Sequence, residues 1–155
     1  MENKRTELKV SAIRNGTVID HIPAGNAFQV VKLLNLDESS RQIYFGTNLD
    51  SKKFGKKGII KISNKYFEEA EINKIALVAP SATLIEIRDY EVTKKGKVQL
   101  PETVKKIVRC FNPKCVTNIQ NIPTKFKVTE DHNGKMKLFC EYCEKTMAKN
   151  NIEFN

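Results

Sequence analysis

The sequence predicts an α+β fold in which a ferredoxin-like antiparallel sheet with two helices is followed by a small β-rich domain. In the first hundred of 155 residues, the patterns follow the order strand, helix, strand, strand, helix, strand, which is typical of the ferredoxin-like arrangement. All four cysteines lie in the last third of the chain. A lysine-rich stretch ending in Leu100-Pro101 separates the two parts, so we expect domains at residues 1–100 and 101–155.

The first elements follow from the periodicity of apolar side chains. Residues 8–13 alternate apolar with polar, as in a half-buried strand, and an Asn-Gly pair at 15–16 then turns the chain. A short β-prone stretch from residue 17 stops at Pro23, which fits the first turn of a helix. Apolar residues at helical spacing predict that this helix runs for about ten residues, to residue 36.

The second half of this domain repeats the alternation. Residues 41–46 and 58–62 are expected to form strands, joined by an exposed and mobile connection at 48–57. Glutamates at 68, 69 and 71 suit the positive end of a helix dipole, and this helix should end at Pro80. We expect the last strand at 83–92 and an exit linker at 94–97.

The cysteines form two closely spaced pairs, Cys110 with Cys115 and Cys140 with Cys143. Each short loop can direct two thiolates at one ion, the pattern of a tetrahedral Zn²⁺ site, and four sulfurs would make this zinc structural, with one ion per chain. The alternative of two disulfides needs an oxidising compartment. Because residues 1–7 lack the apolar run of a signal peptide, we expect a cytoplasmic protein and a metal site. Paired spacing disfavours free core cysteines.

A hairpin signal lies between the two cysteine pairs. Asn133-Gly134 separates the β-prone segments 126–129 and 136–139, which predicts a two-residue turn that brings Cys140 back toward Cys110. A domain of about 50 residues buries too little apolar surface to be stable without a cross-link such as a bound metal ion. A zinc-ribbon (rubredoxin-like) domain is therefore expected.

The charge of the chain favours an anionic partner. Lys and Arg number 27 against 18 Asp and Glu, with 17 against 12 up to residue 100 and 10 against 6 beyond it. Ordinary solvated lysines are the plainer explanation. The phosphate loop, the G-x-S-x-G elbow, H-E-x-x-H and G-x-G-x-x-G are all missing from the sequence, so a protein that binds a nucleotide without consuming it fits better than an enzyme.

Two groups of lysines, at residues 52–61 and 94–97, are candidates for phosphate binding. If the sheet brings Lys61 and Lys95 near His21, the cluster suits a triphosphate. Asp20 would repel phosphates, so we expect it to accept hydrogen bonds from ribose hydroxyls. The alternative is that Asp20 and His21 only cap the following helix.

Several segments, in order over nearly the whole chain, carry a resemblance to a known family. They are Gly16-Thr-Val-Ile-Asp-His-Ile-Pro-Ala24, Ala82-Thr83, Tyr90-Glu91-Val92, Leu100-Pro101-Glu102, and the four cysteines with Tyr142-Cys143-Glu144-Lys145. In these segments the sequence resembles the regulatory chain of aspartate carbamoyltransferase. Ile85 departs from the asparagine that family members can carry, and Pro113-Lys114 differ in the first cysteine loop.

The resemblance implies a non-catalytic allosteric subunit that gives feedback control of pyrimidine biosynthesis. Its N-terminal domain would bind CTP or ATP and pair with a second regulatory chain, and its zinc domain would dock on the catalytic chain, in a dodecamer of six chains of each kind. Asp20, Lys61 and Lys95 would contact ribose, base and phosphate, with His21 and Lys57 near the phosphates. The walls around the base would be formed by Val10, Ala12, Ile13, Val18, Ile87, Tyr90 and Val92.

Two other function classes compete with this hypothesis. Net positive charge and a four-cysteine module also suit a zinc-ribbon nucleic-acid-binding protein, whose affinity would fall steeply with salt. A nucleotide-dependent enzyme is the third possibility. The family resemblance favours neither, so we expect no nucleic acid and no membrane among the partners.

Overall fold

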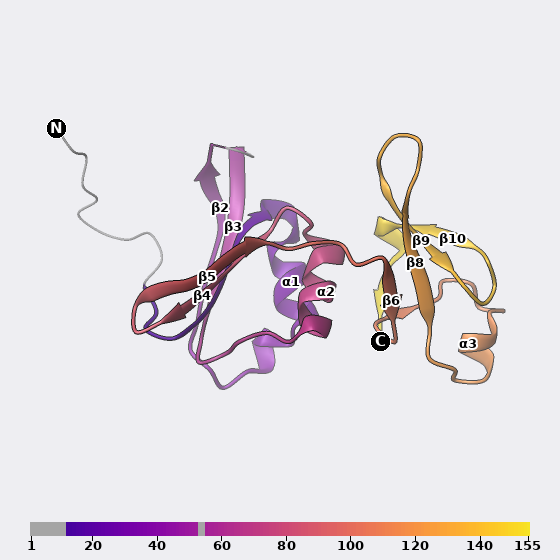
Figure 1. The fold of residues 1–155 in the computed structure, drawn as a ribbon, viewed down its shortest axis with the longest axis horizontal. Helices are drawn as coiled ribbons and strands as arrows, with labels where there is room; N and C mark the ends of the chain where they lie inside the picture. Colours follow the sequence, from indigo (N-terminus) through magenta and orange to yellow (C-terminus); the bar gives the residue numbers. More distant parts are fainter. Residues whose placement is uncertain (1–11, 53–54) are drawn as a thin grey trace. The chain divides into compact units, whose positions relative to one another are not determined.

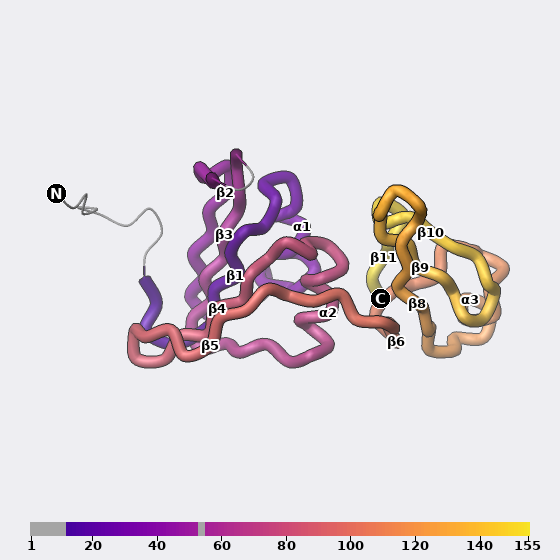
Figure 2. The backbone as a smooth tube through the Cα atoms, turned by 45° about the horizontal axis from the view of Figure 1, so that its top comes forward, coloured from indigo at the N-terminus to yellow at the C-terminus, as the bar shows by residue number. Residues whose placement is uncertain are grey.

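The computed structural model describes residues 12–52 and 55–155, and the chain divides after Val98 into two compact units. Figure 1 labels most of the helices and strands of each unit, and Figure 2 follows the same backbone from a second direction. None of the helices in the described ranges has the length and the apolar character needed to cross a membrane.

The N-terminal unit is a five-stranded antiparallel sheet with two helices, in the order β2-β3-β1-β4-β5. Without β5, this is the ferredoxin-like strand order, so the predicted fold class is confirmed. The elements are β1 (Gly16–Pro23), the 3₁₀ turn η1 (Ala24–Asn26), α1 (Ala27–Leu33), η2 (Leu36–Glu38), β2 (Ile43–Ser51), β3 (Gly55–Ser63), α2 (Glu69–Val78), β4 (Thr83–Arg88) and β5 (Glu91–Lys97).

Both helices lie on the same side of this sheet (Figure 1). Gly58 on β3 faces α1, because a Cβ atom added there would lie 2.7 Å from the Cβ of Ala27. Alternation along the strands puts Ile60 on this face, and pairing with Ile60 puts Ile19 there too. Ile19, Ile22 and Ile60 have no exposed surface. The core therefore lies between one face of the sheet and the helices.

The helix α2 begins and ends where the sequence predicts. Glu68 and Glu71 form a capping box at its first turn, in which each side chain accepts a hydrogen bond from a backbone N–H of the other end of the box. The acidic first turn thus satisfies N–H groups that have no partner within the helix. The chain leaves the helix at Ala79, one residue before Pro80.

Of three predictions about this unit, one falls on residues that the structure does not describe, and two differ from the structure. The first predicted strand, residues 8–13, falls outside the described residues except for Ala12 and Ile13, which belong to no strand. The connection predicted at 48–57 is largely strand, because β2 and β3 remain paired from Leu49 opposite Lys57 to Ser51 opposite Gly55. The hairpin hydrogen bonds outweigh the polar composition that suggested a loop.

The segment predicted as one strand at 83–92, with a linker at 94–97, is a hairpin. Asp89 and Tyr90 both adopt positive φ, 50° and 67°, and form a two-residue turn between β4 and β5. Their conformation is held from outside the hairpin: the N–H of Asp89 donates to Asn15 Oδ1 at 3.0 Å, and the N–H of Tyr90 donates to the Arg14 carbonyl at 2.9 Å. The lysines at 94–97 therefore lie in β5.

The C-terminal unit is built from short strands, as predicted. One sheet has the order β10-β9-β8-β6, and β11 pairs with β7 in a second. The buried side chains of Phe126, Leu138 and Met147 form its apolar centre, each at most 2% exposed. Its elements are β6 (Thr103–Lys105), β7 (Val108–Arg109), α3 (Val116–Ile119), β8 (Lys125–Glu130), β9 (Met136–Cys140), β10 (Thr146–Ala148), η3 (Lys149–Asn151) and β11 (Glu153–Phe154).

The predicted hairpin between the cysteine pairs is present as β8 and β9, with Phe126 opposite Cys140. Its turn is longer than predicted. Only Gly134 of the Asn-Gly pair has positive φ, and the turn runs from Asp131 to Lys135. Asp131 explains the difference, because its Oδ1 accepts hydrogen bonds from the N–H groups of Asn133 and Lys135, at 2.8 and 3.0 Å.

Candidate functional site

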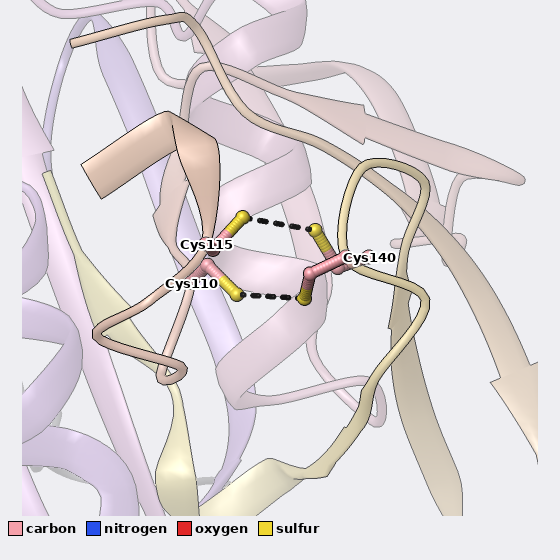
Figure 3. Close-up of side chains that lie close together, drawn as sticks. Cys110, Cys115 and Cys140 are labelled. Carbon is pink, nitrogen blue, oxygen red and sulfur yellow. Dashed lines mark hydrogen bonds between the residues drawn. The ribbon is translucent and has the colours of Figure 1, made fainter. Parts of the chain in front are cut away.

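The four cysteines come together in one cluster, as predicted. Their sulfurs all lie within 4.8 Å of one another, with Cys110 and Cys143 3.7 Å apart and Cys115 and Cys140 3.8 Å apart (Figure 3). A regular tetrahedron with metal–sulfur bonds of about 2.3 Å has edges of about 3.8 Å, whereas a disulfide needs about 2.05 Å. All four thiols are free. The cluster therefore has the size of a tetrahedral metal site, and the disulfide alternative gains no support.

The loop of the first cysteine pair is fixed by amide side chains. Asn118 donates from Nδ2 to the carbonyls of Cys110 and Asn112, at 2.9 and 2.8 Å. Asn112 Oδ1 accepts from the N–H of Lys114 at 3.1 Å, and the Asn112 carbonyl accepts from the N–H of Cys115 at 3.0 Å. These bonds fix the backbone of the loop that carries the two sulfurs. Neither Asn112 nor Asn118 was among the predicted site residues.

The loop of the second pair follows the end of β9. Cys140 donates its N–H to the Lys145 carbonyl at 2.9 Å, and Glu144, with a φ of 63°, donates its N–H to the Cys140 carbonyl at 2.9 Å. This tight turn puts Cys143 beside Cys140. Burial raises the pKa of Cys110 and Cys140, and a bound metal ion would oppose this rise because it lowers the pKa of a coordinating thiol.

Cys143 differs from these two thiols. Burial opposes its ionisation, but hydrogen bonds from Asn112 and from the backbone N–H of Lys145 outweigh burial and lower its pKa to about 7. It is also the one cysteine of the four that is not fully buried. Cys143 therefore ionises more readily than Cys110 or Cys140.

In the N-terminal unit, the residues predicted to bind a ligand gather on the sheet face opposite the helices. Paired strands place partner side chains on the same face. Lys61 on β3 is paired with Val18 on β1, Val18 with Ile85 on β4, and Ile85 with Lys95 on β5. Successive side chains of a strand point to opposite faces of the sheet, and Ile19, the residue after Val18, faces the helices. The row through Val18 therefore lies on the other face. We call this surface the open face.

Asp20 lies on the open face, one step along β1 from this row. Its Oδ1 accepts a hydrogen bond from Lys57 Nζ at 2.7 Å and another from the His21 N–H at 2.6 Å. Both side chains of the Asp20–Lys57 ion pair are mostly shielded from solvent, 16% and 20% exposed. Neither helix is capped by Asp20, since Pro23 and Asn26 occupy the N-cap positions of η1 and α1. The helix-capping alternative is therefore wrong.

A β-bulge positions this part of β1. The register between β1 and β3 shifts between Ile19 and Ile22, and His21 adopts a left-handed φ of 58°. The His21 ring contacts Thr83, with Nδ1 3.3 Å from the hydroxyl oxygen, and the His21 carbonyl accepts a hydrogen bond from Ser81 at 3.0 Å. The bulge thus turns Asp20 and His21 toward one end of the open face.

The charges on this face influence one another. Burial alone would raise the pKa of Asp20, but the hydrogen bonds from Lys57 and His21 outweigh burial and lower it. Burial lowers the pKa of Lys61, and attraction to Asp20 partly opposes that change. Asp20 is thus held as a carboxylate between two lysines.

The other predicted site residues lie toward the opposite end of β1. Ile87 is paired with Gly16 and with Val92, which puts both apolar side chains on the open face. Tyr90, in the turn, is 68% exposed. Ile13 is buried and Ala12 is exposed, just before β1, and Val10 lies outside the described residues. Gly16 and Asp20 are four residues apart, about 14 Å along a strand. The predicted residues therefore line an extended strip rather than one compact cluster.

Three further residues share this face: sequence reasoning assigned no role in the site to Tyr44 or Thr83, and it included Lys97 only within the lysine group at 94–97. Tyr44 is the partner of Lys61 on β2, and Thr83 is paired with both Asp20 and Lys97. The signal for Lys97 was available, because it lies two residues from Lys95 and strand alternation puts the two on one face. Without the hairpin at residues 89–90, however, the sequence assigned both lysines to a linker.

Comparison with known families adds independent evidence. Residues 8–99 match the family described as "Aspartate carbamoyltransferase regulatory chain, allosteric domain", and residues 102–153 match "Aspartate carbamoyltransferase regulatory chain, metal binding domain". Together these matches cover nearly the whole chain. They favour the regulatory-chain hypothesis over a zinc-ribbon nucleic-acid-binding protein.

Individual relatives agree. The aspartate carbamoyltransferase regulatory chain of Bacteroides fragilis is 51% identical over 151 residues, covering 97% of each chain. That of Bacteroides thetaiotaomicron is 50% identical, again with 97% of each chain covered. The regulatory chain of the archaeon Pyrococcus horikoshii is 47% identical over 96% of this chain and 98% of its own.

Proposed function

The chain belongs to the family of aspartate carbamoyltransferase regulatory chains, and on this premise we propose that the open face of its N-terminal domain binds CTP and ATP as allosteric effectors. The chain regulates and does not catalyse, and it combines an allosteric with a metal-binding domain. The observation that carries the proposal is the row that runs from Lys61 through Val18 and Ile85 to Lys95, beside the Asp20–Lys57 pair. We place the domain boundary near residue 100.

The chemistry of this strip suits the three parts of a nucleoside triphosphate. Lys57, Lys61 and Lys95 supply cations for phosphate and base oxygens, with His21 beside them. Asp20 accepts hydrogen bonds and suits ribose hydroxyls. The apolar side chains at the Gly16 end of the face, Ile87 and Val92 among them, suit a flat base. In this proposal, the ligand lies along β1 with its sugar near Asp20.

Regulation requires that the effector bind two assembly states unequally, because a ligand with equal affinity for both states shifts nothing. CTP and ATP share ribose and triphosphate and differ in the base. The contacts around the base would then decide the sign of each effect. Ile85, in the centre of the row, is apolar where family members can carry asparagine. It would therefore pack against the base and could not form a side-chain hydrogen bond with it.

We further propose that the metal is zinc and that the C-terminal domain, from residue 101, docks on the catalytic chain. Four thiolates with a tetrahedral spacing are a typical ligand set of a structural zinc site, and a bound zinc ion would cross-link the two cysteine loops. Regulatory chains would pair through their N-terminal domains, six of them joining six catalytic chains. Four reduced thiols fit a reducing compartment, which supports a cytoplasmic location.

Calorimetric titration of the purified chain with CTP and with ATP tests the proposed nucleotide site. Lys61→Gln and Lys95→Gln should each weaken binding about tenfold, the effect of losing one charge-assisted hydrogen bond. Lys94→Gln is the matched control: it removes the same charge from the neighbouring position of β5, whose side chain alternation directs to the other face.

The outcomes separate the possibilities clearly. Unchanged affinity in both variants would remove Lys61 and Lys95 from the site. An equal loss in Lys94→Gln would show that only the general positive charge of β5 matters. Metal content and the circular dichroism spectrum should stay unchanged in all three variants, because none of these lysines contributes to either core.

A further inference from the structure

The C-terminal unit contains a polar pocket of about 580 Å³ on the side of α3 and of the turn that follows it. Its walls come from five segments: the turn between β6 and β7, the strand β7 itself, the helix α3, the segment 121–124 and the residue after β11. The side chains that matter for its chemistry are Lys106, Arg109, Thr117, Asn118, Asn121 and Thr124.

Backbone ties hold these segments together. The Lys106 N–H donates to the Thr124 carbonyl at 3.0 Å, and the Thr124 hydroxyl donates to the Val108 carbonyl at 2.5 Å. Asn155 closes the same region, donating from its N–H to the Ile107 carbonyl and from Nδ2 to the Lys106 carbonyl, both at 2.9 Å. The pocket is therefore a fixed feature of the fold and not a gap between loose loops.

Both charged side chains that line the pocket are cationic. Lys106 and Arg109 line it, and among the residues that the structure describes no Asp or Glu does. Neither cation takes part in an ion pair with a described carboxylate. Glu153 is the strand partner of Arg109, yet no salt bridge joins their side chains among the described residues. Two cationic side chains thus line one cavity to which no described Asp or Glu side chain contributes.

From these features we infer that the pocket binds a small phosphate-bearing anion. A guanidinium fork and an ammonium group together offer the charge and the donors that a phosphate dianion needs. The side-chain amide of Asn121, which also lines the pocket, can supply a further hydrogen bond. The pocket also contacts the metal centre, because the hydroxyl oxygen of Thr117 lies 3.1 Å from Cys115 Sγ. A ligand here would bear directly on the loop of the first cysteine pair.

The test is a titration of the full, metal-loaded chain with inorganic phosphate, followed by ¹⁵N–¹H NMR spectra at constant ionic strength. The amide signals of Thr117, Asn121 and Thr124 should shift and saturate along a single binding curve. Chloride at matched ionic strength should not reproduce these shifts. Because each amide signal belongs to one residue, the spectra distinguish phosphate binding in this pocket from binding at the proposed nucleotide site. Lys61→Gln should leave the binding curve of these amides unchanged.

Variants assign the binding to the two cations. Lys106→Gln and Arg109→Gln should each weaken phosphate binding at these amides about tenfold or more. Lys127→Gln, an exposed lysine of β8 outside the pocket lining, is the control for net charge and should have no such effect. Spectra without phosphate should keep the signals of the β8–β9 hairpin, which shows that the variants fold.

Three results would overturn the inference. The shifts could fail to saturate, or Lys127→Gln could weaken them as much as Lys106→Gln does. The third result combines two observations: the native chain shows no saturable phosphate binding, and the Lys106→Gln/Arg109→Gln double variant loses affinity for the catalytic chain in a sedimentation assay. The two cations would then serve a carboxylate of a partner protein instead of a free anion.

Discussion

Removal of the metal should unfold the C-terminal unit and leave the N-terminal unit intact. The perturbation is dialysis of the chain against a chelator under reducing conditions. The C-terminal unit begins at Gln99, and its buried centre is small, with Val104, Val108, Phe126, Leu138 and Met147 as its most buried apolar side chains outside the cysteines. The stability of this unit should therefore depend on the metal.

The magnitude follows from the size of this core. A domain of fewer than about 70 residues rarely gains more than about 3–5 kcal/mol from its apolar core, whereas structural zinc sites contribute roughly 10–16 kcal/mol at neutral pH. Without the metal, Cys110, Cys115 and Cys140 also remain as buried thiols with weak hydrogen bonds. The loss should exceed the stability that the core supplies, so the unit should unfold.

The assay is hydrogen exchange of the full chain with and without metal. Amides of the β8–β9 hairpin should lose their protection, while those of β1 and β3 keep theirs. Cys115→Ser should reproduce the effect, and Thr117→Val is the matched control, because Thr117 contacts the sulfur of Cys115 without belonging to the cysteine cluster. Persistent protection of the hairpin in metal-free protein would refute the reasoning, since the apolar core alone would then be sufficient.

Two further predictions concern the N-terminal unit. Asp20→Asn should lower the free energy of unfolding at pH 7 by about 1–3 kcal/mol, because it leaves Lys57 without its carboxylate. Because the pKa of Asp20 is lowered in the folded protein, its carboxylate stabilises the fold at pH values above the ordinary pKa of 3.8, and this contribution is lost as the pH falls below that value. In urea titrations, the free energy of unfolding of the variant should therefore decrease less steeply at acid pH than that of the native chain. An equally steep decrease would contradict this role of Asp20. Gly16→Ala should cost more than about 3 kcal/mol in the same titrations, because its φ is +143° and a Cβ atom would overlap the Ile62 carbonyl oxygen. Gly25→Ala, where a Cβ atom meets nothing within 4 Å, should change stability by no more than about 0.5 kcal/mol, and equal losses in the two variants would rule out this cause.

The sequence allowed the main elements of the fold to be predicted where local patterns agree with tertiary structure. The glutamates at 68 and 71 and Pro80 delimit α2 closely, because capping and the missing proline N–H are local effects. The metal cluster followed from the spacing of the cysteines together with the expected reducing compartment. The β4–β5 hairpin could not be predicted in this way, because the N–H groups of its turn residues Asp89 and Tyr90 donate to Asn15 Oδ1 and to the Arg14 carbonyl, some 75 positions away in the chain.

The open face shows a similar limit. Lys61 and Lys95 were proposed as neighbours from composition and resemblance, but their placement on one row depends on strand register across β3, β1, β4 and β5. Register is a property of paired strands and is not visible within either strand alone. The pocket beside α3 was not predicted at all, because Lys106 and Arg109 resemble ordinary exposed cations until the fold brings Asn121 and Thr124 to them.

The bulge in β1 separates the apolar contacts of the strand from the polar groups that it presents for recognition. Ile19 and Ile22 are three positions apart, yet both are fully buried, so two residues stand between consecutive core positions instead of one. Those two residues are Asp20 and His21. Substitutions at either position change the charge and shape offered to a ligand without changing the apolar contacts that the strand makes with the helices. Ligand preference can therefore diverge among relatives, one substitution at a time, while the same core is inherited.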